Sequence, residues 1–415
     1  MTAPFVSHAV SSPESPAQEA GGPPTGFSPV RDLARDEVVM SADVWVVKVG
    51  SSVLTGPNGR IDPERLHLIA REIGQVCDTG RRVALVSSGA VAAGIGQLGL
   101  PRRPEALRQL QAAAAVGQAH LLHIYDEVFR RQGRHAAQLL LNHDDFDNRE
   151  RYLNIRNTMH ALFEWRAVPV INENDSVSVN EIKLGDNDTL AAMVANLIPA
   201  PLLLILSVVD GLYPTDPTCA PPPNPEGHPA ANEPIRLVPR LDEATLKLAG
   251  LSKSALGTGG MTTKLRAAGL VTRAGGSVII ASGRHDRPLT RFLQGEPGGT
   301  LFLAEGRSHD ARRRWIGLTA RPKGRLVVDD GAKAALIENG RSLLPIGLLD
   351  ARGDFDKGDV VAVEDRQGQE FARGLVNYGL VETLRVRGLR VDQLKKMLGA
   401  ALHDEIIHRD NLVIL

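Results

Sequence analysis

From residue 44 onwards, short runs of β-branched and aliphatic residues alternate with stretches in which apolar residues have helical spacing. Each run is strand-sized and apolar on both faces, which indicates strands that are buried on both sides. Strands separated by helices pair in parallel, and the helices cover both faces of the sheet. The sequence therefore predicts an α/β fold, in which ligands bind beyond the carboxyl ends of the strands. The predicted strands are Val44–Val49, Val83–Val86, Ala136–Leu141, Val168–Ile171, Leu202–Ser207 and Val278–Ala281, and the predicted helices include Pro63–Val76, Glu105–Arg131 and Thr189–Asn196.

A different pattern begins at Arg321, where Gly and Asp turns separate short β runs. Gly324–Asp329 and Gly358–Val363 are predicted strands, and Asp330–Glu338 is a predicted helix. A chain of 415 residues is too long for one ordinary core and suits two domains. We therefore predict a main domain over residues 41–305, a linker over 306–320, and a small β-rich domain with a C-terminal extension over 321–415.

Two segments are too rich in proline and small residues to form a core. The first forty residues are predicted to be a disordered tail. They lack the basic start and apolar run of a secretory signal. The first thirty residues contain no Arg or Lys, whereas an organellar transit peptide is rich in Arg. Because Met40 directly precedes the first strand, translation from Met40 is a further expectation. Pro214–Pro234 is predicted to be a surface loop.

The charge balance argues against a polyanionic partner. Lys+Arg total 48 and Asp+Glu total 48, so the chain has no net field that would attract nucleic acid or an anionic membrane. Its two cysteines form neither a disulfide framework nor a paired metal motif. The longest apolar runs, such as Leu202–Leu206, are far too short to span a bilayer. These features predict a soluble cytoplasmic protein.

Three segments have the composition of anion-binding loops. Lys48–Ser52 ends a strand in a lysine, a glycine and two serines, and Gly257–Lys264 combines glycines, hydroxyls and a lysine at the start of a helix. Ser87–Gly94 leads from a strand into a helix through small residues. Each segment has a structural alternative, respectively a plain turn, a flexible hinge, and close helix–strand packing. None of them is a P-loop, because G-x-x-x-x-G-K-[ST] does not occur in the sequence.

Two loops rich in acids and amides follow a buried strand, at Asn172–Asp175 and Gly185–Thr189. Such residues also favour turns and helix N-caps, and Asp188 could serve only as a cap. Two of these loops together exceed what turns require. They would suit an amino-acid substrate, whose ammonium needs a carboxylate and whose carboxylate needs amides.

Two other motifs imitate functional sites. His408–Asp410 resembles the catalytic loop of protein kinases but lies too close to the end of the chain for the remaining kinase motifs to follow. His143–Asp145 looks like a metal site, yet acidic residues also suit the start of a helix. We therefore assign no metal ligand among these residues.

Five motifs, taken in order, resemble those of the glutamate 5-kinases, a group within the amino-acid kinase family. The resemblance runs from about Val44 to Leu303, and Gly324–Val363 resembles a PUA domain. It implies a three-layer α/β/α sandwich with a mainly parallel sheet, followed by a small β-rich PUA-like domain. The motifs are Lys48–Ser52, Ser88–Ala90, Asn172–Asp175, Gly185–Asp188 and Gly257–Lys264.

The resemblance also implies roles for individual residues. Lys48 and Lys264 would flank the transferred phosphoryl group, and Asp188 would hold both lysines in place. Val208 stands where many relatives have Asp, so a backbone contact to the nucleotide is expected there instead of a side-chain contact. The implied substrate-binding residues are Ser88, Asp175 and Asn187, and the implied ATP-binding residues are Lys48, Ser207, Val208, Thr258, Gly259, Gly260, Met261, Thr262, Thr263 and Lys264.

The implied reaction is ATP-dependent phosphorylation of the γ-carboxylate of L-glutamate, the first step of proline biosynthesis, with Mg²⁺ and with feedback inhibition by proline. A homo-oligomer, a dimer or a tetramer, is implied, and glutamyl-phosphate reductase is a candidate partner. Phosphorylation of aspartate, N-acetylglutamate, carbamate or UMP is an alternative within the same fold. An RNA-binding protein is an alternative of another class, but residues 321–415 contain fifteen Lys/Arg and fifteen Asp/Glu, without the basic surplus of an RNA-binding face.

Overall fold

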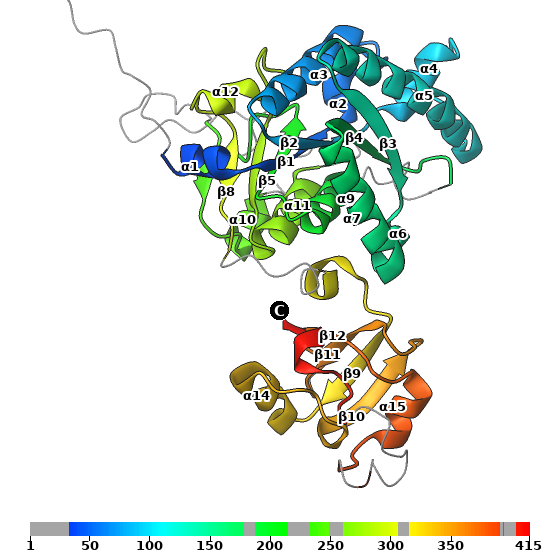
Figure 1. Ribbon diagram of the computed structural model, residues 1–415, viewed down its shortest axis with the longest axis vertical. Helices are drawn as coiled ribbons and strands as arrows, with labels where there is room; N and C mark the ends of the chain where they lie inside the picture. The colour runs from blue at the N-terminus through cyan, green and yellow to red at the C-terminus, as the bar shows by residue number, and fades with distance from the viewer. Residues whose placement is uncertain are drawn as a thin grey trace, which may run out of the picture.

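A computed structural model describes residues 33–177, 187–214, 233–248, 260–305, 315–390, 393 and 404–415 of the chain. The described residues form a large α/β domain and a smaller β-rich domain, which are joined through a short helix (Figure 1). The predicted loop at Pro214–Pro234 lies almost entirely outside the described residues, as does the tail before Leu33.

The large domain is built on a sheet with the strand order β3-β4-β2-β1-β5-β7-β8-β6. Its pairs are parallel from β3 through to β7, whereas β8 runs antiparallel to β7. All six predicted strands are present within two residues of their predicted ends, which confirms the α/β fold. The strands are β1 Val44–Val49, β2 Arg82–Ser87, β3 His135–Leu141, β4 Ala167–Glu173, β5 Leu202–Ser207, β6 Leu237–Val238, β7 Ser277–Ser282 and β8 Thr300–Phe302.

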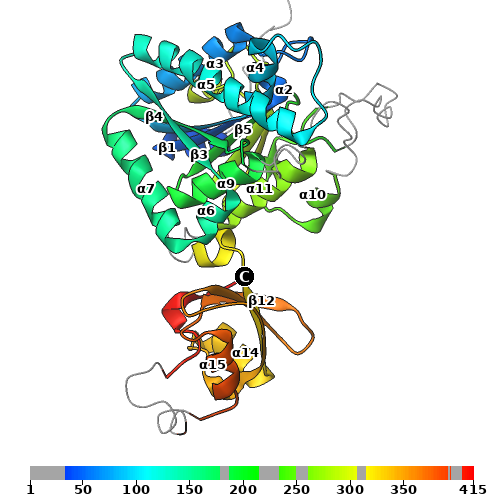
Figure 2. The ribbon, with the colours of Figure 1, turned by 90° about the vertical axis from the view of Figure 1, so that its right-hand side faces the viewer.

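Helices cover both faces of this sheet (Figure 2). The sheet separates the hydrophobic core into two clusters, one on each face. Successive residues of β1 alternate between them, so that Val46 packs on one face and Val47 on the other. One face is covered by α1 Leu33–Ser41, α2 Ser51–Leu54, α3 Pro63–Asp78, α4 Ala90–Gln97, α5 Leu107–Arg131 and α12 Thr290–Leu293. The other face is covered by α6 His143–Asp147, α7 Arg149–Glu164, α9 Asn187–Leu197, α10 Glu243–Leu248 and α11 Met261–Arg273. No helix in the described ranges is long and apolar enough to cross a membrane.

The small residues of α4 serve close packing against another helix, α5, whereas the alternative given for Ser87–Gly94 was packing of a helix on a strand. A β-carbon at Gly94 would lie 1.8 Å from the carbonyl oxygen of Ala113 on α5. A β-carbon at Gly117 would lie 1.9 Å from the carbonyl oxygen of Ala90. The two helices therefore meet backbone to backbone, which only glycine permits at these positions.

The N-terminal helix α1 contradicts the prediction that all of residues 1–40 are disordered. Leu33–Ser41 is helical, Val39 is fully buried, and Arg35 is 3% exposed. The helix lies beside α12 at the edge of the sheet that carries β8 (Figure 1). A chain that starts at Met40 would lose most of this helix, and we expect such a chain to be less stable.

The small domain has its own sheet, with the order β10-β9-β11-β12-β13, and its own core cluster. The predicted strand–helix–strand pattern is present as β9, α14 and β11. Its elements are β9 Gly324–Val328, α14 Asp330–Asn339, η3 Pro345–Gly347, β10 Leu348–Gly353, β11 Val360–Glu364, β12 Glu370–Leu375, α15 Leu380–Val386, η4 Arg409–Asn411 and β13 Leu412–Ile414.

The predicted linker over 306–320 is, in its described part, a buried helix. This helix, η2 Trp315–Thr319, packs against both domains. The indole nitrogen of Trp315 donates to the carbonyl oxygen of Phe146 on α6 at 2.7 Å. A β-carbon at Gly317 would lie 2.8 Å from Val413 of the small domain. The two domains are therefore joined by packing as well as by the chain.

Candidate active site

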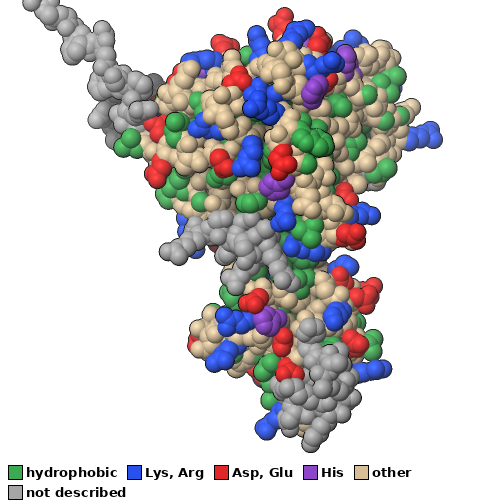
Figure 3. All heavy atoms as spheres, viewed as in Figure 1, with side chains coloured by type: hydrophobic (Ala, Val, Ile, Leu, Met, Phe, Trp, Pro, Cys, Tyr) green, Lys and Arg blue, Asp and Glu red, His purple; other side chains and the backbone are tan. Residues whose placement is uncertain are grey.

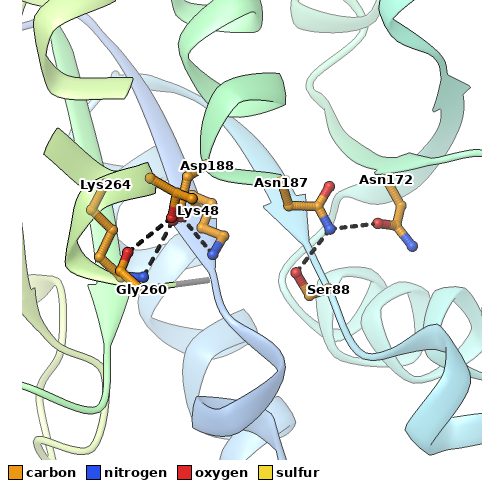
Figure 4. Close-up of polar contacts among 8 residues, drawn as sticks. Lys48, Ser88, Asn172, Asn187, Asp188, Gly260 and Lys264 are labelled. Carbon is orange, nitrogen blue, oxygen red and sulfur yellow. Dashed lines mark hydrogen bonds and ion pairs between the residues drawn. The ribbon is translucent and has the colours of Figure 1, made fainter. Parts of the chain in front are cut away.

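An aspartate between two lysines lies at the carboxyl ends of the central strands. Lys48 projects from β1, Asp188 from the first turn of α9, and Lys264 from the first turn of α11 (Figure 4). The Nζ of Lys48 is 2.6 Å from Asp188 Oδ1, and the Nζ of Lys264 is 3.2 Å from Asp188 Oδ2. All three residues are buried. The side chain of Asp188 therefore pairs with the lysines, and does not serve only as a helix cap.

The two lysines hold Asp188 in the ionised form. Burial alone would raise the pKa of Asp188, but the charges of Lys48 and Lys264 outweigh burial and lower the pKa to about 2. Burial lowers the pKa of Lys264, while Asp188 opposes that shift. The hydroxyl of Thr263 also donates to Asp188 Oδ2 at 2.9 Å. With all three groups ionised, the cluster has a net charge of +1 and faces the end of the sheet where an anionic ligand would bind.

The N-termini of two helices border the lysines. Gly50 caps the short helix α2, and a β-carbon at Gly50 would lie 3.5 Å from Lys48 Nζ. Gly260 caps α11 without a side-chain hydrogen bond of its own, and the first N–H groups of a helix are suited to an anion. Met261–Thr263 form the first turn of α11. The predicted ATP residues Thr258 and Gly259 lie outside the described residues.

A second polar cluster is built from amides and a serine. The Nδ2 of Asn187 donates to Ser88 Oγ at 2.8 Å and to Asn172 Oδ1 at 3.0 Å (Figure 4). Asn172 Nδ2 in turn donates to Gln118 Oε1 at 2.9 Å. The predicted substrate residues Ser88 and Asn187 are thus in direct contact. Asn187 and Asp188 are neighbours at the start of α9, so one helix end positions both clusters.

Gln118 is a member of this network that the sequence did not reveal. It lies on α5, is 8% exposed, and fixes the amide of Asn172. The one feature of the sequence that could have indicated Gln118 is its position on the apolar face of an alanine-rich helix, between the buried residues Ala114 and Leu121. Its partner is 54 positions away in the sequence, which no local pattern indicates.

Two buried acceptors, one in this cluster and one on the loop after β4, have no hydrogen-bond donor among the residues that the structure describes. They are Asp175 Oδ1 and Asn187 Oδ1. Burial, together with the nearby charge of Glu173, raises the pKa of Asp175 to about 7, although Arg103 opposes the shift. Unpaired buried acceptors cost free energy unless a ligand supplies the donors. A ligand with a cationic N–H group would satisfy an acceptor of this kind.

The predicted nucleotide turn follows β5. The carbonyl oxygen of Ser207 accepts from the backbone N–H of Gly283 at 2.8 Å, which ties this turn to the end of β7. The side chain of Val208 is 48% exposed beyond it. The described residues contain no group of three or more His, Cys, Asp or Glu side chains that could hold a metal ion. His143 begins α6, and Asn142 and Asp145 form a capping box there.

Comparisons with known proteins identify the family of the chain. The model of the amino acid kinase family matches residues 43–282, and the PUA domain model matches residues 324–398. A glutamate 5-kinase from Thioalkalivibrio sulfidiphilus is 46% identical over 89% of this chain and 96% of the relative. One from a Geobacter species is 45% identical over 92% of this chain and 100% of the relative. One from Caldanaerobacter subterraneus is 44% identical over 89% of this chain and 97% of the relative. The chain therefore belongs to the amino acid kinase family, within the glutamate 5-kinases that carry a PUA domain.

Proposed function

We propose that this enzyme transfers the γ-phosphoryl group of ATP to the γ-carboxylate of L-glutamate and releases L-glutamyl 5-phosphate and ADP. The observation that carries the proposal is the Lys48–Asp188–Lys264 cluster, together with two buried acceptors, on Asp175 and Asn187, that have no donor among the described residues. A carboxylate oxygen of glutamate forms the new bond to phosphorus. The bond from phosphorus to the β,γ-bridging oxygen breaks, and ADP leaves with that electron pair.

The attack needs no general base in this scheme. The γ-carboxylate of glutamate has a pKa near 4.3 and is ionised at neutral pH. The remaining work is to align the reactants and to stabilise the charge that spreads over the phosphoryl oxygens. Two buried ammonium groups, held apart by Asp188, are suited to that task. Asp188 itself acts as a positioning group for the lysines.

Glutamate would bind through its amino-acid end. Asp175 and Asn187 offer acceptors to the α-ammonium group, and the Ser88 hydroxyl lies within the same network. The start of α9 would then direct the side chain of glutamate toward the lysines. Proline, which also carries an amine and a carboxylate, would compete for these contacts, and we propose feedback inhibition on that basis.

ATP would lie across the other side of the cluster. The N-terminus of α11 is suited to hold phosphates, and we assign this role to Thr258–Lys264. Ser207 and Val208 would contact the base or ribose, with Val208 contributing an apolar surface. Both carboxylate oxygens of Asp188 are engaged by lysines, so this residue is not a free metal ligand. Mg²⁺ would therefore enter with the nucleotide, held by phosphates and waters.

The partners proposed for the enzyme follow from this chemistry. An acyl phosphate is reactive in water, so glutamyl-phosphate reductase is a natural consumer of the product, and the cytoplasm supplies both substrates. RNA is not a proposed ligand of the small domain, where basic side chains such as Arg325, Lys333 and Arg373 pair with acids. Side chains of both signs are interspersed on the face seen in Figure 3. A homo-oligomer remains a proposal from the family alone.

The substrate assignment can be tested with hydroxylamine, which traps acyl phosphates as hydroxamates. With ATP and Mg²⁺, glutamate is expected to support hydroxamate formation, and N-acetylglutamate to be slower by about 10²-fold or more. Acetylation removes the charge that the buried carboxyl of Asp175 would pair with. Aspartate serves as a control with the ammonium kept and the chain shortened. Equal rates with N-acetylglutamate would contradict the assignment.

Removal of residues 321–415 tests whether the small domain contributes to catalysis or only to stability. None of the proposed site residues lies beyond Lys264, so we expect kcat to stay within about tenfold. The buried helix η2 loses its packing against Val413, so we expect the melting temperature to fall by about 5 °C. Enzyme assays and thermal unfolding of both chains provide the measurement. The full-length variant Val413→Ser is the control, because it weakens the same contact while keeping the domain. A larger loss of kcat in a folded truncated chain would show that the small domain takes part in catalysis.

A further inference from the structure

The N-terminal helix inserts an arginine into the edge of the sheet. Arg35 is 3% exposed, and its guanidinium donates to the carbonyl oxygens of Gly298, of Gly299 at 3.2 Å and of Arg236 at 3.1 Å. These acceptors lie 201 to 264 positions away in the sequence. Charge-assisted hydrogen bonds to buried carbonyl groups are among the stronger polar contacts in proteins. Arg35 therefore joins α1 to two distant loops.

The same contacts form part of a closed ring of hydrogen bonds. Thr300 follows the glycine that Arg35 binds, and its Oγ1 accepts from the backbone N–H of Leu212 at 2.8 Å. The carbonyl oxygen of Leu212 accepts from the N–H of Ile235 at 2.7 Å. Ile235 precedes Arg236, whose carbonyl oxygen binds Arg35 again. The ring thus connects α1 to the turn that follows β5.

Glycines make the ring too tight for independent movement of its parts. Gly299 has φ +69°, and a β-carbon there would lie 2.4 Å from the carbonyl oxygen of Ile280. A β-carbon at Gly211 would lie 2.5 Å from Thr300 Oγ1. Both segments are therefore in backbone contact with their neighbours, and a shift of one link displaces the next.

We propose that Arg35 is a positioning residue for the ATP-binding turn Ser207–Tyr213. The inference rests on the proposed function, which assigns ATP contacts to Ser207 and Val208. Leu212 belongs to the same turn, so loss of Arg35 would loosen the turn from its far end. The proposed glutamate-binding residues, Ser88, Asp175 and Asn187, are not members of the ring. Loss of Arg35 should therefore weaken the binding of ATP and leave the binding of glutamate unchanged.

The test compares Arg35→Gln with the unchanged enzyme. The KM for ATP, and the Kd for ATP measured calorimetrically without glutamate, are expected to rise by about tenfold, as for the loss of charge-assisted hydrogen bonds. The KM for glutamate and kcat should change by less than about twofold. Arg35→Lys keeps the charge and should recover part of the affinity for ATP.

A second arginine provides the matched control. Arg81 also donates to backbone carbonyl oxygens of the α1 segment, those of Val39, Met40 and Ala42, but it makes no contact with the ring. Arg81→Gln should weaken the attachment of α1 while leaving the Kd for ATP unchanged. A rise equal to that of Arg35→Gln would mean that general destabilisation, and not the ring, sets the affinity, which overturns the inference.

Thr300→Val breaks the ring at another link and keeps the test decisive if Arg35→Gln does not fold. It should raise the Kd for ATP in the same way, and the double variant should show less than the sum of the two effects, because both act through one unit. Unchanged ATP affinity in folded Arg35→Lys and Thr300→Val would overturn the inference. Failure of the unchanged enzyme to bind ATP would instead refute the proposed function.

Discussion

Replacing Lys48 or Lys264 by alanine is expected to lower kcat by roughly 10²-fold or more, with smaller changes in KM. Each lysine would stabilise charge that develops on the phosphoryl group only in the transition state. Their side chains are 6% and 8% exposed, so water cannot easily replace the lost ammonium group. Steady-state kinetics with both substrates varied gives kcat and the two KM values separately.

Asp188 should behave like the lysines and not like a substrate-binding residue. Asp188→Asn keeps the shape of the side chain but leaves two buried ammonium groups without their carboxylate. We expect a comparable fall in kcat, together with a lower melting temperature. Lys247→Ala, at an exposed lysine on α10, is the matched control and should leave both kcat and the melting temperature unchanged. Near-normal kcat in any of the three site variants, with the fold intact by circular dichroism, would contradict the mechanism for that residue.

The sheet could be predicted because its main strands are continuous apolar runs. β1 and β5 have their predicted ends, since burial on both faces leaves a signal in every residue. β6 and β8 contain two and three residues, too few to show a period. Their pairing depends on a glycine turn and on contacts distant in sequence, which a local pattern does not encode.

The N-terminal helix was missed for a related reason. Its nine residues have little amphipathic pattern and follow a proline-rich segment. Among its anchors is Arg35, whose partners are more than 200 positions away. A charged residue in a short polar stretch indicates solvent exposure when only the sequence is known. Arg35 is buried nevertheless, because carbonyl groups from distant parts of the chain accept its hydrogen bonds.

The grouping of the three charged residues could be predicted, because each lies near the end of a strand or at the start of a helix. Lys48, Asp188 and Lys264 lie in separate motifs, but parallel strands bring their ends to one edge of the sheet. The sequence left open whether Asp188 is a cap, and its distances to both lysines answer that question. Gln118 could not be predicted, because its role is to orient another amide.

The pH dependence of glutamate binding follows from Asp175. In the free enzyme its pKa is raised from 3.8 to about 7, chiefly by burial and then by the charge of Glu173. Below pH 7 the carboxyl is therefore mostly neutral and cannot pair with the ammonium of glutamate. We expect the KM for glutamate to rise by about tenfold per pH unit below pH 7 and to level off above pH 8, while kcat at saturating glutamate stays nearly constant. Initial rates between pH 5.5 and 8.5 provide the measurement.

Two variants and an independent readout separate this effect from other titrations. Asp175→Asn should have a high KM for glutamate that no longer depends on pH, whereas Asn187→Ala should raise KM and retain the pH dependence.

Because the folded protein binds this proton more tightly than the unfolded chain, Asp175 makes the free enzyme less stable as pH rises from about 4 to about 7. Glutamate pairs with the ionised carboxylate, so the increase in melting temperature that it causes should grow over the same pH range. A KM for glutamate that is flat from pH 5.5 to 8.5, or unchanged in Asp175→Asn, would remove Asp175 from the ammonium site.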